Sequence, residues 1–255
     1  MLVWLFVYRP EPVYQGKELS DWARQFGTNN WWTNQAAARE AERAIRAVGP
    51  KAIPFLLDWM QAKESATKKK LRELLPRTWH DRLRLQDTSG NVRRMGAHGI
   101  AALGTNAPPD IVPELIEIGR RHPDEDGRYI AVFALRNLGS LAEQAIPFYI
   151  ECMTNREATI REEGAVGLGM VGRQPEVAVP ALIKYLDFAR TSINSFEARG
   201  TVYALRNYGT NAIPAVPLLI SLLNHEREDI REAVTNSLPS INAEAARKAN
   251  VKRGW

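Results

Sequence analysis

Apolar and small residues recur along this chain with the spacing of an amphipathic helix. The pattern is counted back from six anchor residues, which are named at the end of this paragraph. One place before each anchor stands Val, Leu, Ile or Tyr, and four places before it stands Ile or Leu. Five places before it stands Ala, Gly or Ser, and eight places before it stands Ala, Gly, Thr or Val. Positions with this spacing share one face of an α-helix. The anchors are Gly49, Gly104, Gly139, Gly172, Gly209 and Asn242, with spacings of 55, 35, 33, 37 and 33 residues.

Each anchor marks a turn between two helices. A residue just past a helix end often takes the left-handed conformation, which is cheap for Gly and tolerable for Asn, so we expect it at Asn242 as well. A proline preceded by a β-branched residue follows each of the first five anchors, and apolar residues stand two and three places beyond it. Because proline fits the first turn of a helix, Pro54, Pro113, Pro147, Pro180 and Pro217 predict the starts of second helices.

The pattern therefore predicts six helix pairs. Such pairs cannot bury both apolar stripes alone, so they must stack side by side into an all-α solenoid. We expect a capping segment at 1–34, where Ser20 would N-cap a short helix, then a solenoid over 35–250 and a tail at 251–255. The pairs are expected near 35–62, 91–120, 126–154, 158–187, 196–224 and 228–250.

This pattern resembles the HEAT-repeat family, including the short HEAT-like repeats of phycobilin lyases. The resemblance covers residues 35 to 250 and implies a right-handed superhelix and a module of bacterial type. Four arginines, each eleven places before its anchor, match a basic position of the family: Arg93, Arg128, Arg161 and Arg231. In two other pairs the match slips by one place, to Arg39 and Arg199. The resemblance implies structural contacts between neighbouring repeats for these side chains.

The repeat fails between the first two anchors, where an insert is expected at 63–90. Residues 63–94 carry ten Lys or Arg against four acids, a local charge of +6 in a chain of net charge +5. Leu71, Leu74 and Leu75 have helical spacing, Pro76 should end that helix, and Trp79 and Leu83 suit a second short helix. The sequence thus predicts a basic ridge on an apolar underside. A smaller break, residues 188–196, predicts a longer loop.

Two interpretations of the basic ridge stay open. It either grips phosphates or an acidic protein surface, or it is an irregular helix with hydrated charges. The candidate partner-binding residues are Lys68, Lys69, Lys70, Arg72, Arg77, Trp79, Arg82 and Arg84.

No motif for catalysis, a cofactor or a metal is found. The HEAT-like enzyme deoxyhypusine hydroxylase uses several His-Glu pairs, whereas this chain has only His225-Glu226. The HEAT-like DNA glycosylases use Trp and Asp on a basic face, and Trp79 with Asp81 is the only local parallel. Cys152, the single cysteine, is interpreted as a small buried apolar residue. We therefore expect no catalytic residue, cofactor or metal.

The chain ends and the composition leave the location open. The apolar run Leu2–Tyr8 is too short to cross a bilayer, for which about 20 residues are needed. This run is either an apolar N-terminal segment that packs on the first helices or the end of a membrane anchor that starts upstream. The chain is expected to be soluble as written, and cytoplasmic or membrane-tethered if an upstream anchor exists.

These observations favour a non-enzymatic scaffold that holds a protein partner on the face lined by the second helices. The basic insert would add electrostatic attraction of that partner. The alternative is nucleic-acid binding through residues 63–94, as in a glycosylase-like HEAT protein. A membrane partner would require Leu2–Tyr8 to be a truncated anchor.

Overall fold

The computed structural model describes residues 9–27 and 35–250. Their fold is all-α apart from one hairpin of two-residue strands, and the chain divides into two compact units, Met1–Pro108 (unit 1) and Pro109–Trp255 (unit 2). The run Leu2–Tyr8 lies outside the described residues. Within the described ranges, none of the helices combines the length and apolar character that a membrane span requires.

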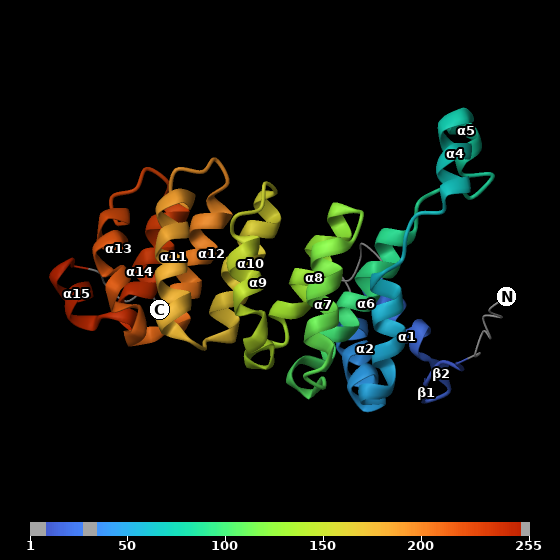
Figure 1. The fold of residues 1–255 in the computed structure, drawn as a ribbon, viewed down its shortest axis with the longest axis horizontal. Helices are drawn as coiled ribbons and strands as arrows, with labels where there is room; N and C mark the ends of the chain where they lie inside the picture. Colours follow the sequence, from blue (N-terminus) through green and yellow to red (C-terminus); the bar gives the residue numbers. More distant parts are fainter. Residues whose placement is uncertain (1–8, 28–34, 251–255) are drawn as a thin grey trace. The chain divides into compact units, whose positions relative to one another are not determined.

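Unit 1 begins with the antiparallel hairpin and continues with helices (Figure 1). Helix α1 packs against α2 and α6, and α3 packs against α6. Its elements are β1 (Val13–Tyr14), β2 (Lys17–Glu18), α1 (Leu19–Gly27), α2 (Gln35–Val48), the 3-10 turn η1 (Gly49–Ala52), α3 (Ile53–Met60), α4 (Ala66–Leu74), α5 (Arg77–His80), α6 (Ser89–Leu103) and η2 (Gly104–Asn106).

Unit 2 is a stack of helix pairs that stand side by side in Figure 1. Its first helices α8, α10, α12 and α14 contact one another in order. The elements are α7 (Ile111–Arg121), α8 (Glu125–Arg136), η3 (Gly139–Ala145), α9 (Ile146–Cys152), α10 (Ala158–Val171), α11 (Pro175–Ala189), α12 (Ser195–Asn207), η4 (Gly209–Ala215), α13 (Val216–Leu222), α14 (Glu228–Ile241) and α15 (Ala243–Lys248).

The predicted helices are confirmed. Each of the six pairs has its two helices at the predicted places, and residues 90–240, all of them described, contain no strand. The residue four places before each anchor is completely buried in all six cases. The small residue five places before allows a second helix to come close. At Gly167, for example, an added Cβ would overlap the ring of Tyr149.

The anchors behave as predicted in five cases and differ in the sixth. Gly49, Gly104, Gly139, Gly172 and Gly209 all have positive φ, between 52° and 65°. The expectation for Asn242 was wrong, because this residue is extended, with φ −152°. Its Oδ1 accepts hydrogen bonds from the N–H groups of Glu244 and Ala245, so Asn242 is the N-cap of α15.

Two other local predictions were wrong. Helix α11 begins at Pro175, so Pro180 lies inside the helix and not in its first turn, unlike the other four prolines. Helix α1 begins at Leu19, so Ser20 is not its N-cap. The carboxylate of Glu11 instead accepts the hydrogen bond from the Ser20 N–H, at 2.8 Å.

The arginines eleven places before the anchors are structural. The Nη1 atom of Arg128 donates to the carbonyls of His122 and Pro123, which lead out of the preceding second helix. Arg161 and Arg231 make the same pair of bonds at equivalent places. Arg93 is 4% exposed and donates to the carbonyl of Ala62 across the insert. Each arginine thus fixes the loop that joins one pair to the next.

Candidate functional site

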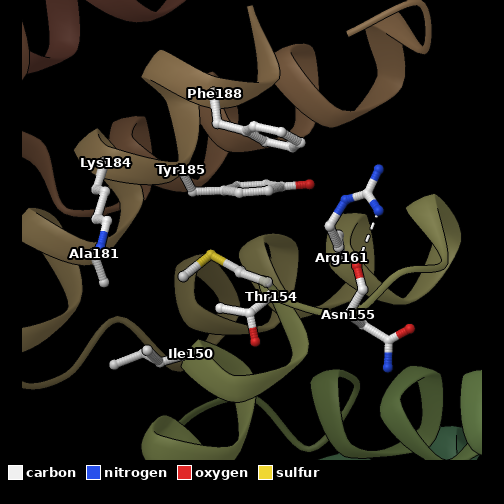
Figure 2. Close-up of a pocket in the computed structure, with 9 residues that line it drawn as sticks. Ile150, Thr154, Asn155, Arg161, Ala181, Lys184, Tyr185 and Phe188 are labelled. Carbon is white, nitrogen blue, oxygen red and sulfur yellow. Dashed lines mark hydrogen bonds between the residues drawn. The ribbon is translucent and has the colours of Figure 1, made fainter.

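A pocket of about 400 Å³ opens between two neighbouring second helices of unit 2 (Figure 2). Helix α9 and the turn after it contribute Ile150, Met153, Thr154 and Asn155. Helix α11 contributes Ala181, Lys184, Tyr185 and Phe188, and Arg161 enters from α10. The pocket has the size of a small-molecule or side-chain site, which typically measures 300–1,000 Å³.

The walls of the pocket are fixed from behind by one buried carboxylate. Glu197, at the start of α12, is 0% exposed. Its Oε1 accepts hydrogen bonds from Arg161 Nε and from the Tyr185 hydroxyl, both at 2.7 Å, and its Oε2 accepts one from Ser192 Oγ at 2.6 Å. The ring of Tyr185 stacks on Phe188, with 6.0 Å between their centroids. The pocket is therefore preformed, because its aromatic and cationic walls are held by bonds outside it.

The electrostatics of Glu197 follow from this arrangement. Burial acts to raise its pKa, but the hydrogen bonds from Arg161, Ser192 and Tyr185 outweigh burial, and the net effect is a pKa below the usual value. Glu197 is thus a carboxylate at neutral pH. Ser192 belongs to the stretch 188–196, for which the sequence predicted only a longer loop. This loop supplies part of the network behind the pocket.

The pocket exists because one repeat position is small. The residue directly after the proline of each second helix is Phe55, Glu114, Phe148, Ala181 or Leu218, and Ala181 is the only small one. Ala181 lines the pocket, so a larger side chain there would fill it. Sequence reasoning missed this site. The departure from a bulky residue at this position is the signal that could have found it.

A second hollow of about 200 Å³ lies at the equivalent place one pair earlier, and Asn155 borders both. It differs because Phe148 occupies the position of Ala181 and a surface ion pair joins Arg120 Nη2 to Glu151 Oε2 at 2.6 Å. Its cation and anion satisfy each other. The larger pocket is therefore the better candidate for binding.

Among the residues that the structure describes, Lys184 is a cation at the larger pocket that has no anion within ion-pair distance. The acids nearby are already paired: Glu197 with Arg161, Asp187 with Arg190, Glu157 with Arg156, and Glu151 with Arg120. Lys184 and Arg161 lie at opposite ends of the pocket, with Tyr185 between them (Figure 2).

The structure brings the predicted partner-binding residues together on the insert. Helices α4 and α5 stand apart from α2, α3 and α6 in unit 1 (Figure 1). Seven of the eight predicted residues are exposed: Lys68, Lys69, Lys70, Arg77, Trp79, Arg82 and Arg84. The eighth, Arg72, has a structural role, because it pairs with Glu64 at 2.5 Å and donates to the carbonyl of Leu85.

The predicted apolar underside of the insert is wrong. Leu74 is 80% exposed, and Leu71, Leu83 and Trp79 are also exposed, so these side chains do not pack on a helical body. Leu75, which connects the two helices, is half-buried, and Leu85, which follows α5, is buried. The reason is that α4 and α5 project from the rest of unit 1, so that their leucine side chains have no neighbouring helix to pack against.

The residues weighed for catalysis are not arranged for it. Asp81 is exposed and accepts a hydrogen bond from Gln86 Nε2 at 2.6 Å. Cys152 is 4% exposed, and burial raises the pKa of its thiol to about 12, which confirms it as a small buried apolar residue. Within residues 9–27 and 35–250, no group of three or more His, Cys, Asp or Glu side chains has the arrangement of a metal site.

Comparison with known proteins identifies the fold. No protein-family model matches the chain, and no curated protein matches its sequence. The crystal structure of Kap121p aligns with 91% of this chain and 30% of its own length, at 10% identity and a TM-score of 0.54. An engineered protein aligns with 88% of this chain and 96% of its own, at 18% identity and a TM-score of 0.47. A computationally designed armadillo repeat protein for modular peptide recognition covers 88% and 100%, at 15% identity and a TM-score of 0.44. Of these three likenesses the first alone has a TM-score above 0.5, and it shows the fold of the chain, an all-α solenoid.

Proposed function

We propose that this protein is a non-enzymatic scaffold that binds a partner protein on the face of unit 2 formed by the second helices. The observation that carries this proposal is the preformed pocket between α9 and α11. Phe188 at its rim is 55% exposed although it is a large apolar side chain. Exposed apolar surface beside a pocket is typical of an interaction site, because a partner that covers it removes apolar area from water.

The insert adds to this function by attracting the partner. Its lysines Lys68, Lys69 and Lys70 are exposed and project from unit 1 with Arg77. Such a cluster raises the rate of encounter with an acidic surface and loses this effect as salt increases.

The spacing of 33 to 37 residues between the later anchors also supports a place for this chain among the short HEAT-like repeats of the phycobilin-lyase type.

The experiment compares partner capture by two variants. Ala181→Phe places in the pocket the side chain that Phe148 provides one pair earlier. Met170→Phe is the matched control, because Met170 is exposed on the same helix pair and does not line the pocket. We expect proteins cross-linked to the native chain and to Met170→Phe to be lost with Ala181→Phe. Equal capture by all three chains would refute the proposal.

Nucleic-acid binding by the insert is the second candidate. It is favoured by Trp79, which is 51% exposed among exposed cations and could stack on a base. This function predicts binding to single-stranded DNA or RNA at about 50 mM salt, with a steep loss of affinity at higher salt. The triple variant Lys68→Glu, Lys69→Glu, Lys70→Glu should abolish it while Arg72 keeps the insert in place. A native chain that binds no nucleic acid at low salt excludes this candidate.

A further inference from the structure

We propose that the pocket between α9 and α11 accepts one large apolar side chain of an extended peptide that carries an acidic residue beside it. This inference rests on the proposed function and names the chemistry of the segment that the pocket takes. It is carried by three features of the pocket: its apolar middle, its exposed aromatic rim and the cations at its two ends.

The middle of the pocket fits an apolar anchor. Ile150, Met153 and Ala181 line it with the ring of Tyr185, whose hydroxyl is directed away to Glu197 and is not available to a ligand. A buried polar group of the ligand would find few partners there and would lose its bonds to water. A large apolar side chain would instead cover the part of Phe188 that is exposed to water, and this burial of apolar surface favours binding.

The ends of the pocket select for acid. Lys184 stands at one end without an ion pair among the described residues. At the other end, Arg161 uses Nε for Glu197 and Nη1 for the carbonyls of Asn155 and Arg156. No described residue accepts a hydrogen bond from its Nη2, although the side chain is 15% exposed and lines the pocket. A carboxylate on the peptide can therefore pair with Lys184, and a second one can approach Arg161 Nη2.

Basic and neutral segments fit less well. The four nearby acids named above are paired with arginines, so a lysine of the ligand would find no unpaired carboxylate there among the described residues and would face Lys184 instead. Like charges at short distance repel, and this repulsion gives selectivity against basic segments. The pocket thus discriminates by charge at its ends and by size in its middle.

A display selection with random heptapeptides tests this inference. The native chain, Ala181→Phe, Lys184→Glu and the control Met170→Phe are used in parallel. We expect the native chain and Met170→Phe to enrich peptides in which Asp or Glu stands within two places of Trp, Phe, Leu or Met. Ala181→Phe should enrich none of them, and Lys184→Glu should lose the acidic preference. The best peptide, synthesised and measured by fluorescence anisotropy, should bind Lys184→Glu at least tenfold more weakly than the native chain.

Two results would overturn the inference. One is enrichment of the same peptides by the native chain and by Ala181→Phe, and the other is a native selection with no acidic preference. Both are distinguishable from a failure of the proposed function. If cross-linked partners still depend on Ala181 while the selected peptides lack acid, the scaffold function stands and the assigned ligand chemistry is wrong.

Discussion

Arg161 and Glu197 form an ion pair between two neighbouring helix pairs, with 2.7 Å between Nε of the arginine and Oε1 of the glutamate. Glu197 is completely buried, and Arg161 also donates to the carbonyls that leave the preceding pair. One side chain therefore ties together three parts of unit 2: the loop before α10, helix α10 itself and the start of α12. The same bonds hold the walls of the pocket.

Removing the charge of Glu197 should destabilise the protein strongly. In Glu197→Gln, the half-buried Arg161 guanidinium loses its anion, and because the carboxylate side of this pair is completely buried, breaking the pair costs up to about 3–5 kcal/mol. Urea denaturation followed by circular dichroism measures the loss of unfolding free energy. Glu244→Gln is the control, because Glu244 pairs with Lys248 on the surface and its loss should have no measurable effect. Equal effects of the two variants would contradict the structural role of the pair.

The stability of the protein should depend on pH through Glu163. Burial raises the pKa of Glu163 to about 7, although Arg136 acts to lower it from 3.1 Å away. Because this pKa lies above the unfolded value of 4.5, its contribution to stability is present below pH 4.5 and is lost as the pH rises through 7. The loss amounts to roughly 3 kcal/mol.

The variant Glu163→Gln isolates this effect. Its unfolding free energy relative to the native chain should rise between pH 5 and pH 8, when both are measured by urea denaturation. Groups that do not interact with Glu163 cancel in this difference. His98, for example, has its pKa lowered to about 4 by burial and so acts in the opposite direction, and Glu197 titrates only in more acidic solution. The neighbouring Glu162, whose pKa burial also raises, instead acts on Glu163 directly. A difference that stays constant with pH would show that Glu163 is not the group responsible.

Gly167→Ala should destabilise unit 2. The added Cβ would overlap the ring of Tyr149, which is fully buried and cannot move aside without disturbing its neighbours. Overpacking of this kind costs about 1–3 kcal/mol, more than the gain in helix propensity from Ala. The midpoint of thermal unfolding should therefore fall. Gly200→Ala serves for comparison, because an added Cβ there would lie 3.2 Å from its nearest neighbour, Cγ2 of Val166, against 2.4 Å from the Tyr149 ring at Gly167, and it should lower the midpoint far less.

Tyr149→Phe should stabilise the protein. The hydroxyl of Tyr149 is buried and has no hydrogen-bond partner among the residues that the structure describes. Removing an unsatisfied buried hydroxyl relieves its desolvation cost, which is on the order of 1 kcal/mol. The midpoint of urea denaturation should increase, and Tyr185→Phe should lower it, because that hydroxyl donates to Glu197. A decrease in Tyr149→Phe would reveal a partner for the hydroxyl.

Substitutions at Asn242 distinguish an N-cap from a left-handed turn. As the N-cap of α15, Asn242 should be replaced by Asp with little change and by Ala at a cost of about 1 kcal/mol. Replacement by Gly should also lower the stability slightly. If the residue were left-handed, as its place in the repeat predicts, Gly would instead raise the stability, because positive φ is cheap for Gly. Chemical denaturation of the three variants decides between the two.

The repeated part of the fold could be predicted from the sequence because one physical requirement recurs in every pair. The stripe residues, such as Leu168, must be buried, and Gly172 must turn the chain with positive φ. Asn242 shows where this reasoning ends. The same amide side chain suits either a left-handed turn or an N-cap, and only the presence of α15 directly after it selects the second.

The candidate site could not be predicted because it depends on departures from the pattern. Ala181 leaves a space that its counterparts fill, and the network behind it joins Tyr185, Ser192 and Glu197 from three segments. The insert was predicted correctly as two short helices. The burial of its leucines was not, since the spacing of Leu71 and Leu74 is the same whether a helix packs on a neighbour or projects into water.

Methionine-methyl NMR tests the central claim that the pocket between α9 and α11 is the binding site. The chain has five methionines, of which Met153 lines the pocket, Met170 is exposed outside it and Met60 is buried in unit 1. On titration with the best selected peptide, we predict a saturable shift of the Met153 methyl signal, with the Met60 and Met170 signals unchanged. Saturable binding by anisotropy without a shift of the Met153 signal would contradict the account.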